Sequence, residues 1–106
     1  MKQIGLIILA VLLAAPAWAS APPTVEIKND SFNPAKLTIV AGQTVTFNNR
    51  DDDAHTVTSV DGVFDSKGVD TGQTWRYTFT KPGTYAYFCT LHPFMKGTIV
   101  VKAAQP

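Results

Sequence analysis

Three side chains that could bind a soft metal ion stand close together near the end of the chain. Cys89, His92 and Met95 follow one another at steps of three residues within the run YAYFCTLHPFM. Thiolate, imidazole and thioether ligands select copper or zinc over magnesium or calcium. The chain has one other histidine, His55, which would complete a set of four. A set with a single thiolate lacks the extra cysteines of a structural zinc site, so these residue types favour copper.

Each of these residues has a simpler interpretation when it is taken alone. A buried cysteine is often a small core hydrophobe, a methionine often fills a gap in a core, and a histidine is often a surface residue. Outside the cytoplasm, a single cysteine is a reactive thiol, an intermolecular bridge or a metal ligand. A nucleophilic enzyme built on Cys89 and a histidine is a further alternative, but the chain is small and shows no oxyanion motif. Together, the four donors favour a metal site.

The spacing of the donors constrains the backbone around them. In an extended strand, at ~3.3 Å per residue, Cys89 and His92 would lie about 10 Å apart, too far for one ion. Pro93 fixes its own backbone and cannot donate a strand hydrogen bond. We therefore predict a rigid loop that leaves a strand at Cys89 and enters another near Gly97.

Short alternating segments predict an all-β domain, and no window has a sustained helical period. We expect His55 to open a strand over residues 55–59. The strand at 75–79 carries Trp75, Tyr77 and Phe79 on one face, and we expect the chain to run back antiparallel over 85–89 after a tight turn at 81–84. The other expected strands cover residues 25–28, 37–40, 44–48 and 96–102. Seven or eight short strands predict a Greek-key β-sandwich.

The first 19 residues have the pattern of a secretory signal peptide. A positive start with Lys2 precedes an apolar run, and Ala17-Trp18-Ala19 is a small-x-small cleavage pattern. We predict cleavage after Ala19, which leaves one domain over residues 20–106. A retained membrane anchor is the alternative, but about 12 apolar residues are fewer than the roughly 20 that span a bilayer.

The net charge of the chain does not indicate a class of binding partner. Nine basic residues stand against eight acidic ones, and loss of Lys2 leaves the two equal. No basic stretch suits nucleic acid. The acidic run Asp51-Asp52-Asp53 is expected to be a solvated loop, with docking of a positively charged partner as the alternative.

Three segments together resemble the cupredoxins, the type 1 blue copper proteins, over nearly all of residues 20–106. They are Phe32 to Asn49 with its Phe-x-Pro-Ala and Gly-x-Thr-Val-Thr-Phe patterns, His55-Thr56-Val57, and Pro82 to Gly97 with its Cys-x-x-His-x-x-Met loop. The short ligand loop is most similar to that of the amicyanin branch. Two positions depart from that branch: Leu91 replaces a proline, and Thr56 replaces an asparagine. We expect Thr56 to tie the two ligand loops by a different hydrogen bond.

The resemblance implies a cupredoxin-like sandwich that binds one type 1 copper ion through His55, Cys89, His92 and Met95. It implies a carrier of single electrons that cycles between Cu(II) and Cu(I), and no enzyme, because protein ligands fill the site. Redox protein partners would dock transiently near His92, with Leu91, Pro93 and Phe94 as an apolar patch. We further expect a periplasmic monomer. A copper-binding module for metal delivery, buffering or resistance is the alternative function.

Overall fold

The computed structural model describes residues 22–105, and the predicted signal peptide over residues 1–19 lies outside that range. Eight strands and no helix occur between residues 22 and 105. The predicted all-β fold is therefore confirmed. The strands are β1 (Thr24–Lys28), β2 (Ser31–Asn33), β3 (Lys36–Val40), β4 (Thr44–Asn49), β5 (Thr58–Ser59), β6 (Thr74–Thr78), β7 (Gly83–Phe88) and β8 (Lys96–Lys102).

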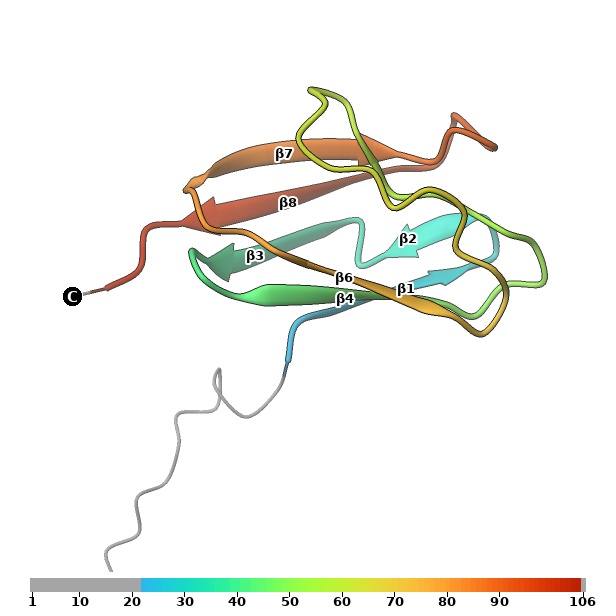
Figure 1. The fold of residues 1–106 in the computed structure, drawn as a ribbon, viewed down its shortest axis with the longest axis horizontal. Coiled ribbons are helices and arrows are strands. Elements are labelled where there is room, and N and C mark those ends of the chain that lie inside the picture. Colours follow the sequence, from blue (N-terminus) through green and yellow to red (C-terminus); the bar gives the residue numbers. More distant parts are fainter. Residues whose placement is uncertain (1–21, 106) are drawn as a thin grey trace, which may run out of the picture.

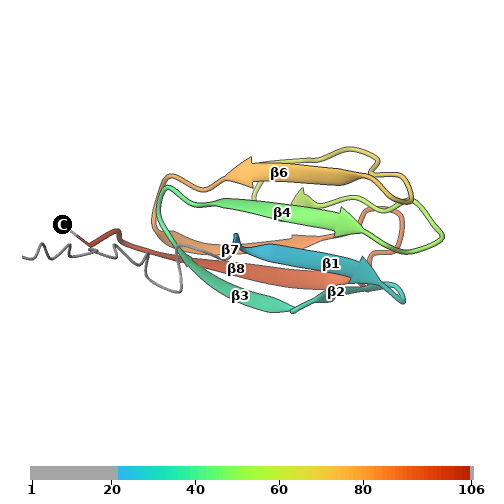
Figure 2. The same cartoon turned by 90° about the horizontal axis from the view of Figure 1, so that it is seen from below.

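Two four-stranded sheets form a sandwich. One has the strand order β2-β1-β4-β6 and the other has the order β3-β8-β7-β5. Most neighbours are antiparallel, but β1 pairs with β4 and β3 pairs with β8 in parallel. The strands of both sheets run along the same long direction (Figure 2). The loops that join them therefore gather at the two ends of the sandwich, where they can bring together residues from distant parts of the sequence (Figure 1).

Alternating side chains from the two sheets fill the core. In β1 the burial alternates so that Val25 and Ile27 are fully buried, as a strand with one face on a core requires. Phe47 of β4 and Tyr87 of β7 meet edge to face with ring centroids 5.5 Å apart. This contact joins the two sheets. The predicted aromatic face of residues 75–79 is also confirmed, because Trp75 and Tyr77 pack against the core and Phe79 is buried.

The strands on either side of the predicted turn at residues 81–84 do not pair with each other. β6 pairs with β4, whereas β7 pairs with β8 and β5 in the other sheet. The connection therefore crosses from one sheet to the other. Alternation shows which face of a strand is buried, but it does not show which strand lies beside it.

His55 does not open a continuous strand as predicted. It forms an isolated bridge with Val69, and β5 begins only at Thr58. The amide N–H groups of the two residues between them donate to side chains instead of to a neighbouring strand: Thr56 donates to Cys89 Sγ and Val57 donates to Ser66 Oγ.

None of the described residues, 22–105, forms a helix long and apolar enough to cross a membrane.

Candidate metal centre

Three potential ligands meet at one end of the sandwich. The donor atoms of His55, Cys89 and His92 all lie within 4.8 Å of one another. Cys89 Sγ is 3.7 Å from Nδ1 of His55 and 3.8 Å from Nδ1 of His92. The two imidazole rings are tilted by 54° with their centroids 4.8 Å apart. The sequence therefore correctly predicted that His55 comes to the loop after β7.

The loop between β7 and β8 is held in a tight turn by its own backbone. The N–H of Cys89 donates to the carbonyl of Met95 at 3.1 Å, and the N–H of Met95 donates to the carbonyl of His92 at 2.8 Å. These bonds bring both ends of the loop together, as the three-residue spacing requires. The predicted loop between two strands is thus confirmed, with Cys89 just after β7 and Met95 just before β8.

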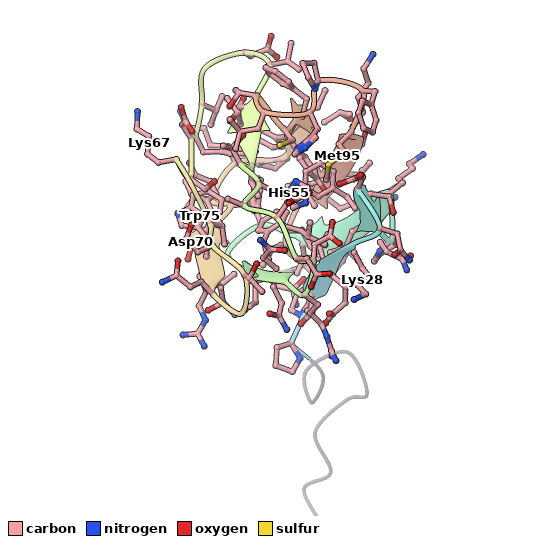
Figure 3. The ribbon with its side chains drawn as sticks, turned by 90° about the vertical axis from the view of Figure 1, so that its right-hand side faces the viewer. Lys28, His55, Lys67, Asp70, Trp75 and Met95 are labelled. Carbon is pink, nitrogen blue, oxygen red and sulfur yellow. The ribbon has the colours of Figure 1, made fainter. Side chains whose placement is uncertain are left out.

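Met95 is buried, as His55 and Cys89 are. Its side chain is 2% exposed and belongs to the same apolar cluster as Cys89. Figure 3, which looks onto the loop end of the sandwich, shows the labelled side chains of His55 and Met95 at the centre of the view. A thioether in this position suits a soft ion and contributes no charge.

The surroundings of Cys89 favour its thiolate. Burial by itself raises the pKa of the Cys89 thiol, but hydrogen bonds to the sulfur outweigh burial and lower the pKa below its usual value. The donors are the amide of Thr56, the side chain of His92, and the amides of Leu91 and His92. The Thr56 amide lies 3.3 Å from Sγ. Since the thiolate is the form that binds metals, the loop lowers the free-energy cost of forming the ligand.

Thr56 joins the two loops that carry the ligands. Its hydroxyl oxygen accepts the N–H of Thr90 at 2.8 Å and lies 3.2 Å from the Thr90 hydroxyl. Thr56 follows His55 and Thr90 follows Cys89, so these bonds fix the distance between the two ligand loops. This is the connection that the sequence predicted for Thr56.

His92 is the most accessible of the four residues. His55 and Cys89 are fully buried and Met95 is nearly so, whereas His92 is half-buried. Leu91 and Phe94 beside it are 56% and 68% exposed, and the ring of Phe94 is 6.1 Å from that of His92, centroid to centroid. The predicted apolar surface around His92 is therefore present. The carboxylates of Asp30 and Asp53 also reach within 4.8 Å of a His92 ring nitrogen.

Asp51 is a contact of the site that the sequence interpretation missed. Its carboxylate lies 2.8 Å from Nε2 of His55, and its side chain is 15% exposed, so Asp51 does not belong to a purely solvated loop as predicted. Asp52 and Asp53 are exposed as expected. An Asp four residues before a potential ligand histidine, within a polar loop, is the signal that could have identified this contact.

Hydrogen bonds stabilise the charged form of Asp51. The N–H of Asp30 lowers its pKa most, burial opposes this change, and His55 and the N–H of Asn29 lower the pKa further, to about 2. Asp51 is therefore ionised at neutral pH and acts only as a hydrogen-bond acceptor.

The residues present fit a copper ion of the blue type. One cysteine favoured as thiolate, two histidines with Nδ1 toward its sulfur, and one buried methionine match the donor set of such a site. The profile of the Cupredoxin-like domain family matches residues 3–101. The chain belongs to the cupredoxin-like family.

Individual relatives agree with this assignment. The cupredoxin is 38% identical over 94 residues to amicyanin of Paracoccus denitrificans, which covers 84% of this chain and 72% of that protein. It is 39% identical over 83 residues to amicyanin-alpha of Methylorubrum extorquens, covering 74% and 70%. A copper(I) structure of an amicyanin variant superimposes with a TM-score of 0.73 at 35% identity, covering 76% of this chain and 82% of that one.

More distant cupredoxins share the fold as well. A purple cupredoxin of Nitrosopumilus maritimus superimposes with a TM-score of 0.70 at 29% identity, covering 76% of this chain and 99% of that chain. Cupredoxins such as amicyanin carry one type 1 copper and transfer electrons without being enzymes. The protein is therefore a small copper-containing electron carrier, and its partners are redox proteins. The similarity to amicyanin favours electron transfer over copper delivery.

Proposed function

We propose that His55, Cys89, His92 and Met95 are the four copper ligands of this electron carrier. The observation that supports the proposal most is that Nδ1 of each histidine lies within 3.8 Å of Cys89 Sγ. Copper bound there would supply a one-electron Cu(II)/Cu(I) couple. The protein would hold the donors in nearly fixed positions in both states, because the two ligand loops are bonded to each other and to the sheets.

The chain would exclude water from the ion on all but one side. His55, Cys89 and Met95 are buried at one end of the sandwich, so His92 is the proposed ligand nearest to solvent. Electrons would therefore enter and leave at the His92 edge. Leu91 and Phe94 form an exposed apolar surface there, which suits a small and transient docking contact.

Replacing the proposed thiolate and thioether should have unequal effects. Copper(II) added to the metal-free parent should give an intense thiolate-to-copper band in the visible spectrum. Cys89→Ser should remove that band while the fold persists, because Ser can still accept the Thr56 amide. Met95→Leu should retain copper and colour with a changed reduction potential, because a thioether would be the weakest of the four donors. Colour in Cys89→Ser, or equal loss of copper in both variants, would contradict the ligand assignment.

Electron self-exchange between copies of the protein can test the docking surface. We expect Phe94→Ser to slow self-exchange about tenfold, because the loss of about 1.4 kcal/mol of apolar contact corresponds to that factor. Val60→Ser is the matched control, since Val60 is 60% exposed but bonds to Ala86, away from the ligand loop. The proposed surface is wrong if both variants exchange at the parent rate.

The proposal also places the protein in the periplasm as a monomer after removal of residues 1–19. Its support is the signal-peptide pattern of the sequence and the similarity to amicyanins. Fractionation of the producing cells and mass spectrometry of the purified protein test this part. We expect a periplasmic chain that begins at Ser20, and a chain that keeps Met1 in the membrane fraction would contradict it. The division into residues 1–19 and 20–106 is part of the same proposal.

A further inference from the structure

The turn between β1 and β2 supports the carboxylate that contacts His55. Asn29 and Asp30 both have a φ of 54°, the left-handed conformation of a tight two-residue hairpin turn. Their successive N–H groups point to one side and donate to the two oxygens of Asp51, at 3.2 Å to Oδ1 and 3.0 Å to Oδ2. Successive backbone N–H groups of this kind form a natural seat for an anion.

The loop that carries Asp51 is fixed at its other side by a buried asparagine. Asn49 is fully buried, and its side-chain oxygen accepts the N–H of Asp51 at 2.9 Å. Its amide nitrogen donates to the carbonyls of Asp53 and Val69, both at 2.9 Å. Two backbone hydrogen bonds join Val69 to His55, because the N–H of each residue donates to the carbonyl of the other. Asp51 and His55 are therefore held in one closed network of hydrogen bonds.

This network decides which nitrogen of His55 carries the proton. Nε2 lies 2.8 Å from Asp51 Oδ2 and 3.7 Å from Asp30 Oδ1, and a carboxylate can only accept. A neutral His55 that donates a hydrogen bond to this carboxylate carries its proton on Nε2. Nδ1, which lies 3.7 Å from Cys89 Sγ, then has a free lone pair and can bind a metal.

We propose that Asp51, seated on the N–H groups of the β1–β2 turn, is the positioning residue that fixes the metal-binding tautomer of His55. The inference rests on the proposed ligand set for its effect on copper. The tautomer of His55 in the metal-free protein can be tested without assuming that ligand set. A carboxylate that accepts Nε2–H also makes the imidazole a stronger donor, which favours Cu(II) over Cu(I).

The tautomer can be measured directly in the metal-free protein by long-range ¹H–¹⁵N NMR of the histidine rings. We expect the parent His55 to show the Nε2–H form alone and Asp51→Ala to show a mixture of tautomers. Asp51→Asn keeps one acceptor oxygen and should fall between the two. Asp52→Ala is the matched control, because it removes the same charge from an exposed neighbour, and it should match the parent.

Copper binding gives the second measurement. Relative to Asp52→Ala, Asp51→Ala should bind Cu(II) about 10- to 100-fold more weakly, the usual effect of losing the partner of a ligating histidine, and should have a higher reduction potential. An unchanged tautomer in a folded Asp51→Ala overturns the inference, as does an equal loss of affinity in both alanine variants. If Asp51→Ala does not fold, an Asp51→Asn protein with the parent tautomer ratio and affinity overturns it. A parent without copper colour would instead contradict the ligand assignment, whatever the tautomer.

Discussion

Tyr87 is a buried tyrosine whose ring packs in the core, while its hydroxyl is not accommodated by a hydrogen bond to any of residues 22–105. It is 1% exposed, and its ring packs edge to face on Phe32 and Phe47 with centroids 4.8 and 5.5 Å apart. Among residues 22–105 its hydroxyl has no hydrogen-bond partner, and burial raises its pKa. A buried hydroxyl without a partner costs about 1–3 kcal/mol.

Tyr87→Phe should therefore leave the free energy of unfolding unchanged or raise it by about 1 kcal/mol. The ring contacts remain and only the unpaired hydroxyl is removed. Urea denaturation of the parent and the variant measures the difference. A loss of more than about 1 kcal/mol would show that the hydroxyl makes a bond that stabilises the fold.

Gly97, on the neighbouring strand β8, offers a complementary substitution. It lies directly opposite Tyr87, and a Cβ added to it would come 2.3 Å from the ring. Gly97→Ala should therefore destabilise the protein by about 1–3 kcal/mol through overpacking. The opposite signs of the two changes would distinguish the space needed by the ring from the role of the hydroxyl.

At the scale of elements, the sequence predicted most of the strands but not β2 (Ser31–Asn33), and it did not predict which strands lie side by side. The alternation in residues 25–28 and 75–79 reflects which side chains enter the core, and this information is local. The parallel pairing of β1 with β4 and the antiparallel pairing of β6 with β4 depend on residues far away in the chain. Alternation alone carries no information about them.

The site shows the same contrast between features that the local sequence predicts and features that depend on distant residues. The residue types and spacing predicted His55, Cys89, His92 and Met95, because few other combinations of soft donors are available in the chain. The role of Asp51 could not be predicted, since it depends on the β1–β2 turn lying beside the loop after β4. Contacts between two loops follow from the order of the strands in the sheet and not from the sequence of either loop.

Thr56 should affect the stability of the joined loops more than the copper ligands. Thr56→Val keeps the shape of the side chain and the backbone N–H that donates to Cys89 Sγ, but it removes the acceptor of the Thr90 N–H. We expect copper and colour to remain, the free energy of unfolding to fall by about 1 kcal/mol, and copper to be lost faster to a chelator. Denaturation and stopped-flow chelation measure these effects.

Thr38→Val, on an exposed position of β3 far along the sequence from both loops, is the control. It changes the same atoms without touching the site, so the rate of copper loss should equal that of the parent. A Thr56→Val protein that releases copper at the parent rate would show that the bond between the loops does not retain the metal.

At the scale of the whole molecule, copper should stabilise the sandwich by linking its parts. The proposed ligands come from the loop after β4 and from the loop between β7 and β8, which belong to different sheets. A metal that binds the folded chain but not the unfolded one adds stability through its binding equilibrium. This addition is about 4 kcal/mol when free metal exceeds the dissociation constant a thousandfold.

Removal of copper should therefore lower the melting temperature of the parent without changing its strands. Calorimetry of the copper-loaded and metal-free proteins measures the loss, and far-ultraviolet circular dichroism checks the β-structure. In Cys89→Ser the difference between the two forms should be much smaller, because the thiolate contributes most of the affinity for a soft ion. Equal melting temperatures for the loaded and metal-free parent would mean that the unfolded chain binds copper as tightly as the folded one, and that the sandwich does not preorganise its ligands.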